Sequence, residues 1–309
     1  MEYCVFTEPQ QGFSYAQQLA SAQATERLGF AGWFRSDHYL AMGAGDPLPG
    51  PTDAWTTLAG LARETERVRL GTLVSPVTFR HPGILAIQVA QVDEMSGGRA
   101  ELGLGAGWFE REHEAYGIPF PPRRFDLFEE QLEVMTGLWA TAEGQTFDHQ
   151  GTAYRLTQSP ALPKPVQPQV PVIIGGGGQR RTPALAARFA TEFNIGFQPE
   201  DKVADAFERV RQACVDAGRQ PDSLKLSVAL PTVVGRDDAT LDRRLAAIGR
   251  ERDGNEGAAM FFGGAEEIIP KVERLAALGA SRIYFQQVDL TDLDQLDERG
   301  TEILPHLPR

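Results

Sequence analysis

Short β-rich runs alternate with longer amphipathic stretches along the whole chain. Eight runs rich in aliphatic and aromatic residues predict strands. These runs are YCVFT (3–7), FAGWF (30–34), RVRLGTLV (67–74), RAELGLG (99–105), VPVIIG (170–175), TEFNIGF (191–197), SLKLSVAL (223–230) and SRIYFQQ (281–287). Between and after them, apolar residues recur with the period of an α-helix. The predicted helices cover 14–28, 53–66, 83–95, 125–139, 181–189, 199–217, 239–252, 265–278 and 293–304.

This alternation favours parallel strands joined by right-handed helical crossovers. Eight strand–helix units predict a closed (β/α)8 TIM barrel, an α/β fold. An open doubly wound sheet is the alternative, because the pattern alone does not show closure. The segment FDHQGTAYRL, within 145–156, predicts a hairpin inserted after the fourth unit and turning at Gln150 and Gly151. No repeat or obvious linker divides the chain, so we expect one domain over 1–309.

The composition restricts the partners of this protein. Its 309 residues have a formal net charge of −12, from 42 acidic and 30 basic side chains. Sequence-independent nucleic-acid binding depends on Lys and Arg, so we expect no nucleic-acid partner, although a local basic patch suffices for an anionic cofactor. Cys4 and Cys214 lie far apart and predict neither a disulfide framework nor a zinc site. With no signal peptide and no membrane-spanning run, we expect a cytoplasmic protein.

Polar residues and glycines gather after five consecutive predicted strands. In an α/β barrel these loops form the active site. The five groups are Glu8-Pro9-Gln10, then Asp37 and His38, then Ser75, Thr78, Arg80 and His81, then GLGAGWFEREHEAYG (103–117), and finally GGGGQRRT (175–182). Histidine suits proton transfer near neutral pH, so His38 is a candidate general acid and Asp37 a candidate cofactor contact. A polar turn with a surface histidine is the alternative for this pair.

The four glycines at 175–178 predict an anion site. Glycine allows successive N–H groups to point at an anion, and the helix that follows adds its positive N-terminal end. Arg180 and Arg181 lie in that first turn, where a cation is unfavourable unless an anion is bound. The spacing fits neither a Walker A loop nor a Rossmann fingerprint. A flexible strand-to-helix loop is the alternative.

Other chemistries find little support. The acids and histidine at 110–114 do not match a metal-binding pattern, and acids at a helix start favour the helix dipole, so we expect no metal. There is no Gly-x-Ser-x-Gly elbow and no Cys beside a plausible His, which argues against a nucleophilic hydrolase. A bulkier side chain in place of Gly105 or Gly107 would obstruct any group that lies across the barrel mouth, and this accounts for glycine at both positions.

Five segments together resemble the luciferase-like flavin and deazaflavin oxidoreductases, above all the branch that uses coenzyme F420. They are SDHY, LGTLVSPVTFRHP, SGGRAELGLGAGWFEREHEAYGIPF, LPKPVQ and VPVIIGGGG. The resemblance is dense over about 3–198 and weaker over 263–285. It implies a (β/α)8 barrel, often dimeric, with the cofactor ring across the C-terminal mouth.

The resemblance also implies roles for individual residues. His38 matches a histidine close to the reactive edge of the deazaflavin, and Asp37 precedes it in the same motif. Leu73-Val74 falls where members have a bulge with a non-proline cis peptide that supports one ring face. The remaining implied cofactor contacts are Ala106 and Gly107 at the ring, and Gly176, Gly177, Gly178 and Arg180 at the phosphate.

One position departs from the family pattern. Members that oxidise a sugar phosphate have a catalytic glutamate directly after the Ala/Thr-Gly pair, and this chain has Trp108 there. An indole at the mouth indicates a flat or apolar substrate. Glu110 or Glu112 could replace the missing acid, and we expect Trp108 and Glu112 to contact substrate.

The sequence therefore predicts an oxidoreductase, a homodimer, that transfers a hydride between F420 and a small organic substrate. One alternative is an FMN-dependent monooxygenase that uses reduced flavin and oxygen. Another is a non-catalytic carrier of flavin or deazaflavin, which a mouth closed by Trp108 would favour. Basic residues near the mouth favour F420, whose oligoglutamate tail is anionic; they are Arg80, Arg111, Arg123, Arg124, Arg180 and Arg181.

Overall fold

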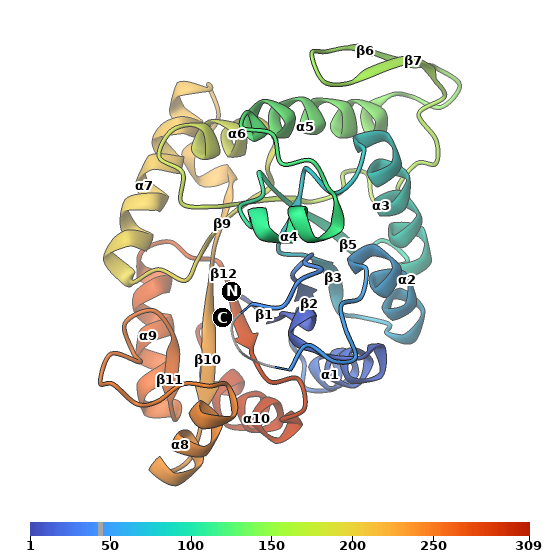
Figure 1. The fold of residues 1–309 in the computed structure, drawn as a ribbon. Coiled ribbons are helices and arrows are strands. Elements are labelled where there is room, and N and C mark those ends of the chain that lie inside the picture. Colours follow the sequence, from blue (N-terminus) through green and yellow to red (C-terminus); the bar gives the residue numbers. More distant parts are fainter. Residues whose placement is uncertain (43–45) are drawn as a thin grey trace.

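A barrel of strands surrounded by helices forms the centre of the protein (Figure 1). The computed structural model describes residues 1–42 and 46–309. The barrel strands are β1 (Glu2–Thr7), β2 (Gly32–Arg35), β3 (Arg69–Thr72), β5 (Ala100–Gly105), β8 (Val172–Gly175), β9 (Glu192–Gly196), β10 (Lys225–Val234) and β12 (Arg282–Gln287). These eight strands confirm the eight predicted runs, with ends that differ by a few residues.

Hydrogen bonds close the barrel completely. Parallel pairs connect β1, β2, β3, β5, β8, β9, β10 and β12 in that order, and β12 pairs with β1. Cys4, for example, lies between Gly32 on one neighbouring strand and Tyr284 on the other. An open doubly wound sheet would leave two free edges. The closed order therefore confirms the (β/α)8 barrel and excludes that alternative.

Helices cover the outside of the barrel. They are α1 (Tyr15–Arg27), α2 (Ala54–Glu64), α3 (Pro82–Ser96), α4 (Glu110–Tyr116), α5 (Arg124–Ala140), α6 (Arg181–Phe189), α7 (Glu200–Asp216), α8 (Asp238–Ala247), α9 (Ala265–Ala277) and α10 (Leu293–Glu298). The helix predicted to end at 252 ends at Ala247, because Gly249, just beyond the C-cap residue Ile248, takes a left-handed conformation with φ of 68°. Within the described residues, no helix combines the length and apolarity needed to cross a bilayer.

The predicted hairpin is present and projects from the barrel (Figure 1). It consists of β6 (Phe147–Gln150) and β7 (Arg155–Ser159), which pair antiparallel. The turn is longer than the tight one predicted at 150–151. The carboxylate of Glu130 on α5 explains this, because it accepts hydrogen bonds from the backbone N–H groups of Thr152, Ala153 and Tyr154.

Two short strands were not expected from the pattern. β4 (Ser75–Pro76) pairs with the end of β5, and β11 (Phe261–Gly263) pairs with the end of β10 beyond the barrel. A strand of two or three residues has too little sequence to show a period. Both strands are defined by their partners rather than by their own pattern.

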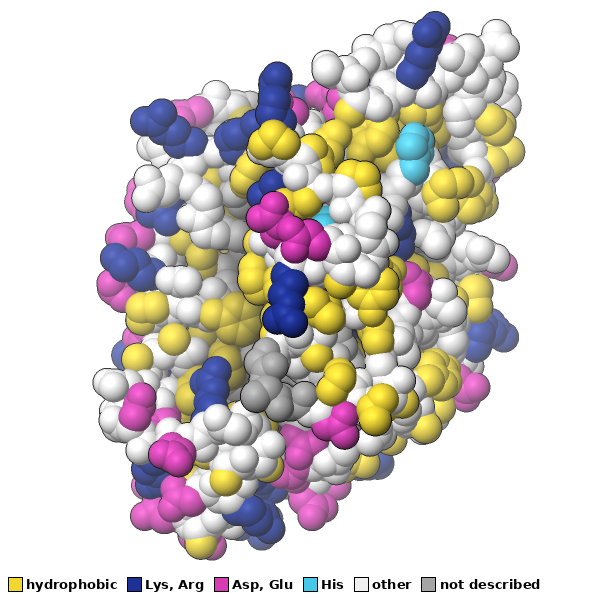
Figure 2. Space-filling view, viewed as in Figure 1, with side chains coloured by type: hydrophobic (Ala, Val, Ile, Leu, Met, Phe, Trp, Pro, Cys, Tyr) yellow, Lys and Arg dark blue, Asp and Glu magenta, His cyan; other side chains and the backbone are white. Residues whose placement is uncertain are grey.

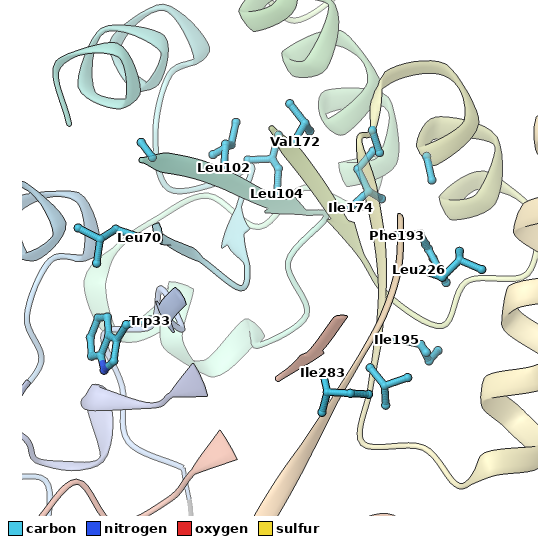
Figure 3. Close-up of a cluster of buried hydrophobic side chains, with 14 of the residues drawn as sticks. Trp33, Leu70, Leu102, Leu104, Val172, Ile174, Phe193, Ile195, Leu226 and Ile283 are labelled. Carbon is cyan, nitrogen blue, oxygen red and sulfur yellow. The ribbon is translucent and has the colours of Figure 1, made fainter. Parts of the chain in front are cut away.

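The apolar residues form two layers. Residues that alternate along the strands point outward and pack against the helices, as Figure 3 shows for Trp33, Leu102 and Ile174. The intervening residues point into the barrel and fill its interior with a smaller cluster, which includes Phe34 and Ile173. This is the two-residue period of a strand used on both faces.

Charged residues fill the interior at the N-terminal end of the strands. Arg282 lies between Glu101 and Glu192, with its Nη1 atom 2.7 Å from one carboxylate oxygen of each. Glu192 also accepts a hydrogen bond of 2.7 Å from the Tyr284 hydroxyl. Although burial opposes its ionisation, Arg282 and Arg69 lower the pKa of Glu101 to about 2. Burial instead raises the pKa of Glu192. This end of the barrel contributes to stability, and the opposite end is left for a site.

Candidate active site

A cavity of about 490 Å³ opens at the C-terminal end of the barrel strands. Residues from the ends of β1, β2, β3, β5, β8 and β9 line it, together with α4 and α5. Figure 2 shows hydrophobic side chains gathered next to α4 in the middle of this face, whereas charged side chains dominate its lower and left margins. The size falls within the range of small-molecule sites. The cavity is therefore the candidate active site.

His38 lies in the cavity wall and is held by Glu112. Its Nδ1 atom is 2.9 Å from Oε2 of Glu112, whose side chain is fully buried. The other carboxylate oxygen of Glu112 accepts hydrogen bonds from the backbone N–H groups of Tyr39 and Leu40. With these bonds, Nδ1 of the imidazole donates to the carboxylate and Nε2 has no partner among the described residues. Such an arrangement fixes the tautomer of a proton-transferring histidine.

Glu112, predicted to contact substrate, lines the cavity, but its carboxylate is already engaged. Helix α4 places Glu112 and His113 on its buried side, and both carboxylate oxygens of Glu112 are engaged with the loop that holds His38. Glu112 is thus a positioning residue for His38. Its neighbour His113 accepts a hydrogen bond of 2.6 Å from Thr78 at Nε2 and donates to the Phe109 carbonyl from Nδ1. These bonds anchor the start of α4 at the cavity.

Asp37, predicted to contact the cofactor, is not among the residues that line the cavity. Successive residues of an extended chain point to opposite sides, so Ser36 and His38 line the cavity and Asp37 points away from it. Asp37 is fully buried, where it accepts a 2.6 Å hydrogen bond from the Ser75 hydroxyl and forms an ion pair with Arg80. Its role in the structure is to support the loop beneath His38.

Arg80 is the centre of that support. It pairs with Asp37 and Asp53 and donates a 2.9 Å hydrogen bond to the Tyr39 hydroxyl. Although burial disfavours its charge, Asp37 and its other partners raise the pKa of Arg80. Asp53 also caps α2 by accepting from the N–H of Thr56 at 2.8 Å. We call Arg80, Asp37, Asp53 and Tyr39 the Arg80 cluster.

Glu8 is a cavity residue that the shortlist from the sequence did not include. It follows β1 directly and lines the cavity with His38. Burial raises its pKa, an effect that His38 and the amides of Gln286 and Gln10 partly offset. A carboxyl group in such surroundings is a candidate proton carrier. In the sequence, the position of Glu8 directly after a predicted strand was the feature that could have identified it as a site residue.

The strand-end glycines make room for Val74. A Cβ atom on Gly105 would lie 2.8 Å from Cγ2 of Val74, whereas one on Gly103 would first meet the Thr72 carbonyl oxygen at 2.0 Å and also lie 3.0 Å from Cγ1 of Val74. A Cβ on Gly175, on the next strand, would come within 3.2 Å of the same side chain. Glycine at 105 is thus required by packing within the wall. The Leu73-Val74 peptide bond is cis, and both residues line the cavity.

Ala106 and Gly107 continue the wall beyond this strand. Both line the cavity, as predicted from the resemblance for ring contacts. Gly107 has a φ of 79°, a left-handed conformation that strains any other side chain. Arg124 donates to the Gly107 carbonyl through Nε at 3.4 Å and lies 3.6 Å from the centroid of the Phe120 ring. A substitution at Gly107 would therefore change the backbone as well as the cavity.

The glycine loop after β8 lies at the cavity edge. Gly176, Gly177 and Gly178 line it together with Thr182 in the first turn of α6. A Cβ on Gly178 would meet the Thr182 hydroxyl oxygen at 2.4 Å, whereas a Cβ on Gly177 would meet nothing within 4 Å. The loop thus presents its backbone to the cavity, directly before a helix N-terminus. This is the geometry of an anion-binding loop.

The arginines near the mouth differ in availability. Arg180 is exposed and does not line the cavity. Arg181 forms ion pairs with Asp126 at 2.6 Å and Glu129 at 3.4 Å, and Arg123 also pairs with Asp126. Arg80 is engaged in the Arg80 cluster. Several of the arginines that favoured F420 in the sequence therefore already have acidic partners.

Trp108 lines the cavity and is 66% exposed. Its ring stacks on Phe109, with centroids 5.1 Å apart, and meets the His38 ring edge to face at 6.0 Å. The indole therefore stands beside the histidine at the mouth and does not close the cavity. No group of three or more possible metal ligands occurs within residues 1–42 and 46–309.

A sequence profile of the luciferase-like monooxygenase family matches residues 1–282. The chain belongs to this family. An uncharacterised protein of Mycobacterium bovis is 32% identical over 230 residues, which cover 73% of this chain and 75% of that protein. An F420-dependent glucose-6-phosphate dehydrogenase of Microbacterium testaceum is 33% identical over 205 residues, 64% of this chain and 58% of that enzyme.

Solved structures of other oxidoreductases share the fold. An F420-dependent secondary alcohol dehydrogenase in complex with an F420–acetone adduct has a TM-score of 0.84 at 19% identity, over 100% of this chain and 99% of the other. The oxygenating constituent of 3,6-diketocamphane monooxygenase from Pseudomonas putida, in complex with FMN, has a TM-score of 0.81 at 18% identity, over 100% and 99%. At such identities these likenesses establish the fold, and neighbours of both cofactor classes possess it.

Proposed function

We propose that this luciferase-like protein is an oxidoreductase that binds coenzyme F420 and transfers a hydride between it and a small organic substrate. The observation on which the proposal depends is the pair His38–Glu112. It places an imidazole of fixed orientation in the wall of an otherwise largely apolar cavity. Reduction of a carbonyl group, or its reverse, moves a proton as well as a hydride, and His38 is placed to supply or accept that proton.

The residues of the cavity fit such a cofactor. The glycine loop at 176–178 offers backbone N–H groups and a helix start to a phosphate. Val74 and Ala106 contribute apolar side chains to the cavity wall, against which a planar ring can lie. When bound, the deazaflavin supplies the hydride chemistry. We assign the ring wall to Leu73, Val74, Ala106 and Gly107, and Arg180, next to the loop, to the anionic end.

The chain's own residues then provide orientation and proton transfer. Glu112 holds the His38 ring, and the Arg80 cluster holds the loop on which His38 lies. Glu8, whose pKa is raised by burial, shares the cavity and is the second candidate proton carrier.

Two observations bear on the alternatives. The acidic partners of Arg123 and Arg181 reduce the charge available for an oligoglutamate tail, and this favours FMN as the second candidate cofactor. The exposed position of Trp108 and the open cavity beside it argue against a non-catalytic carrier. The one-domain organisation and the homodimer remain part of the proposal, and sedimentation of the purified protein tests the dimer.

The decisive experiment compares binding of F420 and FMN to the purified protein in equilibrium titrations at low and moderate salt. We expect tight F420 binding that weakens with salt and weak FMN binding. A preference for FMN would assign the protein to the monooxygenase branch. If neither cofactor binds, the proposed function is wrong.

A matched pair of variants tests the phosphate loop. A side chain at Gly177 meets no neighbour, so Gly177→Asp adds a negative charge without disturbing the fold. We expect it to weaken cofactor binding about tenfold or more, equivalent to about 1.4 kcal/mol, by repulsion of the phosphate. Gly177→Asn is the isosteric neutral control and should bind nearly as well as the native protein. Equal affinities for both variants would contradict a phosphate at this loop.

A further inference from the structure

Phe197 has an unusual backbone for its residue type. It follows β9 directly and has a φ of 59°, with its N–H donating to the Ala229 carbonyl at 2.9 Å. The left-handed conformation is common for glycine and unfavourable for a bulky side chain. A Phe in this conformation persists where its surroundings or its use require the ring.

Packing in the core does not explain the ring. Phe197 is 48% exposed and lines the cavity at the C-terminal end of the barrel. Glycine at this position would satisfy the backbone at no steric cost and expose less apolar surface. The side chain thus costs stability and contributes nothing to the two apolar layers of the fold. Because the ring lies in the cavity wall, we expect it to contact a ligand bound in the cavity.

The strand order places Phe197 across the mouth from His38. β9 lies four places from β2 in a closed barrel of eight strands, so the ends of the two strands are opposite each other. Trp108 stands on the His38 side, where the two rings are 6.0 Å apart. The cofactor assigned above occupies the wall of β3, β5 and β8. The space between Phe197 and the pair His38–Trp108 is left for the substrate.

The charges of this space exclude a class of substrates. Among the described residues, no Lys or Arg lines the cavity, and its acidic members are Glu8 and Glu112. A phosphate or carboxylate on the substrate would find no Lys or Arg there and would face Glu8. A planar apolar group, in contrast, gains from contact with aromatic rings on both sides.

We propose that Phe197 and Trp108 form an aromatic clamp that selects an uncharged, flat substrate, such as an aromatic ketone or aldehyde, and rejects anionic ones. The clamp rests on the proposed function, because it places the substrate in the part of the cavity that the bound cofactor does not occupy. It assigns to Phe197 the role of a specificity-determining residue.

Calorimetric titration of the cofactor-saturated protein tests the clamp with two matched probes. The first is 2-acetonaphthone, and the second is 2-naphthoate, which has the same rings with a carboxylate in place of the acetyl group. We expect 2-acetonaphthone to bind at least about tenfold more tightly. Comparable binding of 2-naphthoate would overturn the selection against anions.

Phe197→Gly separates the ligand role from a structural one. Because glycine suits the left-handed backbone, we expect unchanged or raised thermal stability, unchanged cofactor affinity and about tenfold weaker binding of 2-acetonaphthone. Gln158→Gly is the matched control, since Gln158 also has a left-handed backbone, with φ of 49°, but lies on the hairpin away from the cavity. The control should bind both cofactor and 2-acetonaphthone like the native protein.

The possible results distinguish the clamp from the function on which it rests. Unchanged 2-acetonaphthone binding by Phe197→Gly, with normal cofactor binding, would overturn the clamp and leave the proposed function intact. Weakened cofactor binding by this variant would place Phe197 at the cofactor instead and would also overturn the clamp. Failure of the native protein to bind either F420 or FMN would overturn both proposals.

Discussion

The Nδ1 atom of His38 lies 2.9 Å from the Oε2 atom of Glu112, although 74 positions separate the two residues in the chain. The contact joins the loop after β2 to the helix after β5. Because the same carboxylate also accepts from two backbone N–H groups beside His38, the imidazole and its loop are held together. The histidine can then present Nε2 to a ligand in one orientation.

Replacing Glu112 by Gln should reduce turnover more than binding. The neutral amide has one acceptor oxygen in place of two, so it cannot serve both Nδ1 and the backbone N–H groups, and it lacks the charge that stabilises a protonated imidazole. We expect kcat to fall by about 10²–10⁴-fold, with KM and cofactor affinity little changed. Steady-state kinetics as a function of pH provides the measurement, since a positioning role also moves the pH profile of kcat.

Glu114→Gln is the control for that variant. Glu114 belongs to the same helix but is exposed, and we expect native kinetics from it. A Glu112→Gln protein with native kcat and a native pH profile would contradict the assignment of His38 as the proton carrier.

Gly105→Ala should destabilise the barrel mouth through Val74. The new Cβ would lie 2.8 Å from Cγ2 of Val74, so the wall must shift. Overpacking of this kind costs about 1–3 kcal/mol of unfolding free energy. Val74→Ala removes the atom that clashes, so the double variant should lose less stability than the sum of the two single variants. Chemical denaturation of the four proteins measures this coupling.

Gly177→Ala serves as a comparison in the same experiment, because a Cβ there meets no atom within 4 Å. We expect the unfolding free energy of this variant to stay close to the native value. Strict additivity of Gly105→Ala and Val74→Ala would show that the glycine has another purpose.

The Arg80 cluster should be sensitive to the loss of its cation. Arg80→Met leaves Asp37 fully buried without its partner, which costs about 3–5 kcal/mol of unfolding free energy. Adding Asp37→Asn removes the uncompensated charge and should restore part of that loss. Urea denaturation measures both variants, and a single variant as stable as the double one would argue against a buried ion pair here.

The buried charges at the other end of the barrel should make stability depend on pH. The pKa of Glu101 is lowered to about 2 in the folded protein, below its ordinary value of 4.5. As the pH falls, the Glu101 carboxylate is therefore protonated in the unfolded chain before it is protonated in the folded protein. The stability that this carboxylate contributes above pH 4.5 is lost as the pH falls toward 2. We expect the melting temperature to decrease between about pH 5 and pH 3.

Glu101→Gln should lower stability at neutral pH and make its dependence on acid less steep. The exposed residue Glu143 offers a control, and Glu143→Gln should keep the native pH profile. Equal slopes for Glu101→Gln and the native protein over this pH range would assign the acid sensitivity to other carboxylates.

Much of the fold was predictable because its signals are local. The period of apolar residues defined the eight barrel strands and most of the helices, and helix α6 begins and ends at the predicted residues, Arg181 and Phe189. The positions of the strand ends also predicted that His38 and the glycines at 176–178 would meet at one cavity. These inferences use only the order of residues along the chain and the rule that the active site of an α/β barrel lies at the C-terminal ends of its strands.

The tertiary structure decided what each side chain at the mouth contacts. Asp37 and Glu112 were assigned to ligands from the sequence, but their carboxylates are bound by Arg80 and His38, from segments far away in the chain. The space beside Gly105 belongs to Val74, and Phe197 faces the cavity through a left-handed backbone that no pattern of residues indicated. Periodicity depends on nearest neighbours, whereas a hydrogen bond or a clash depends on which distant segments the closed barrel brings together.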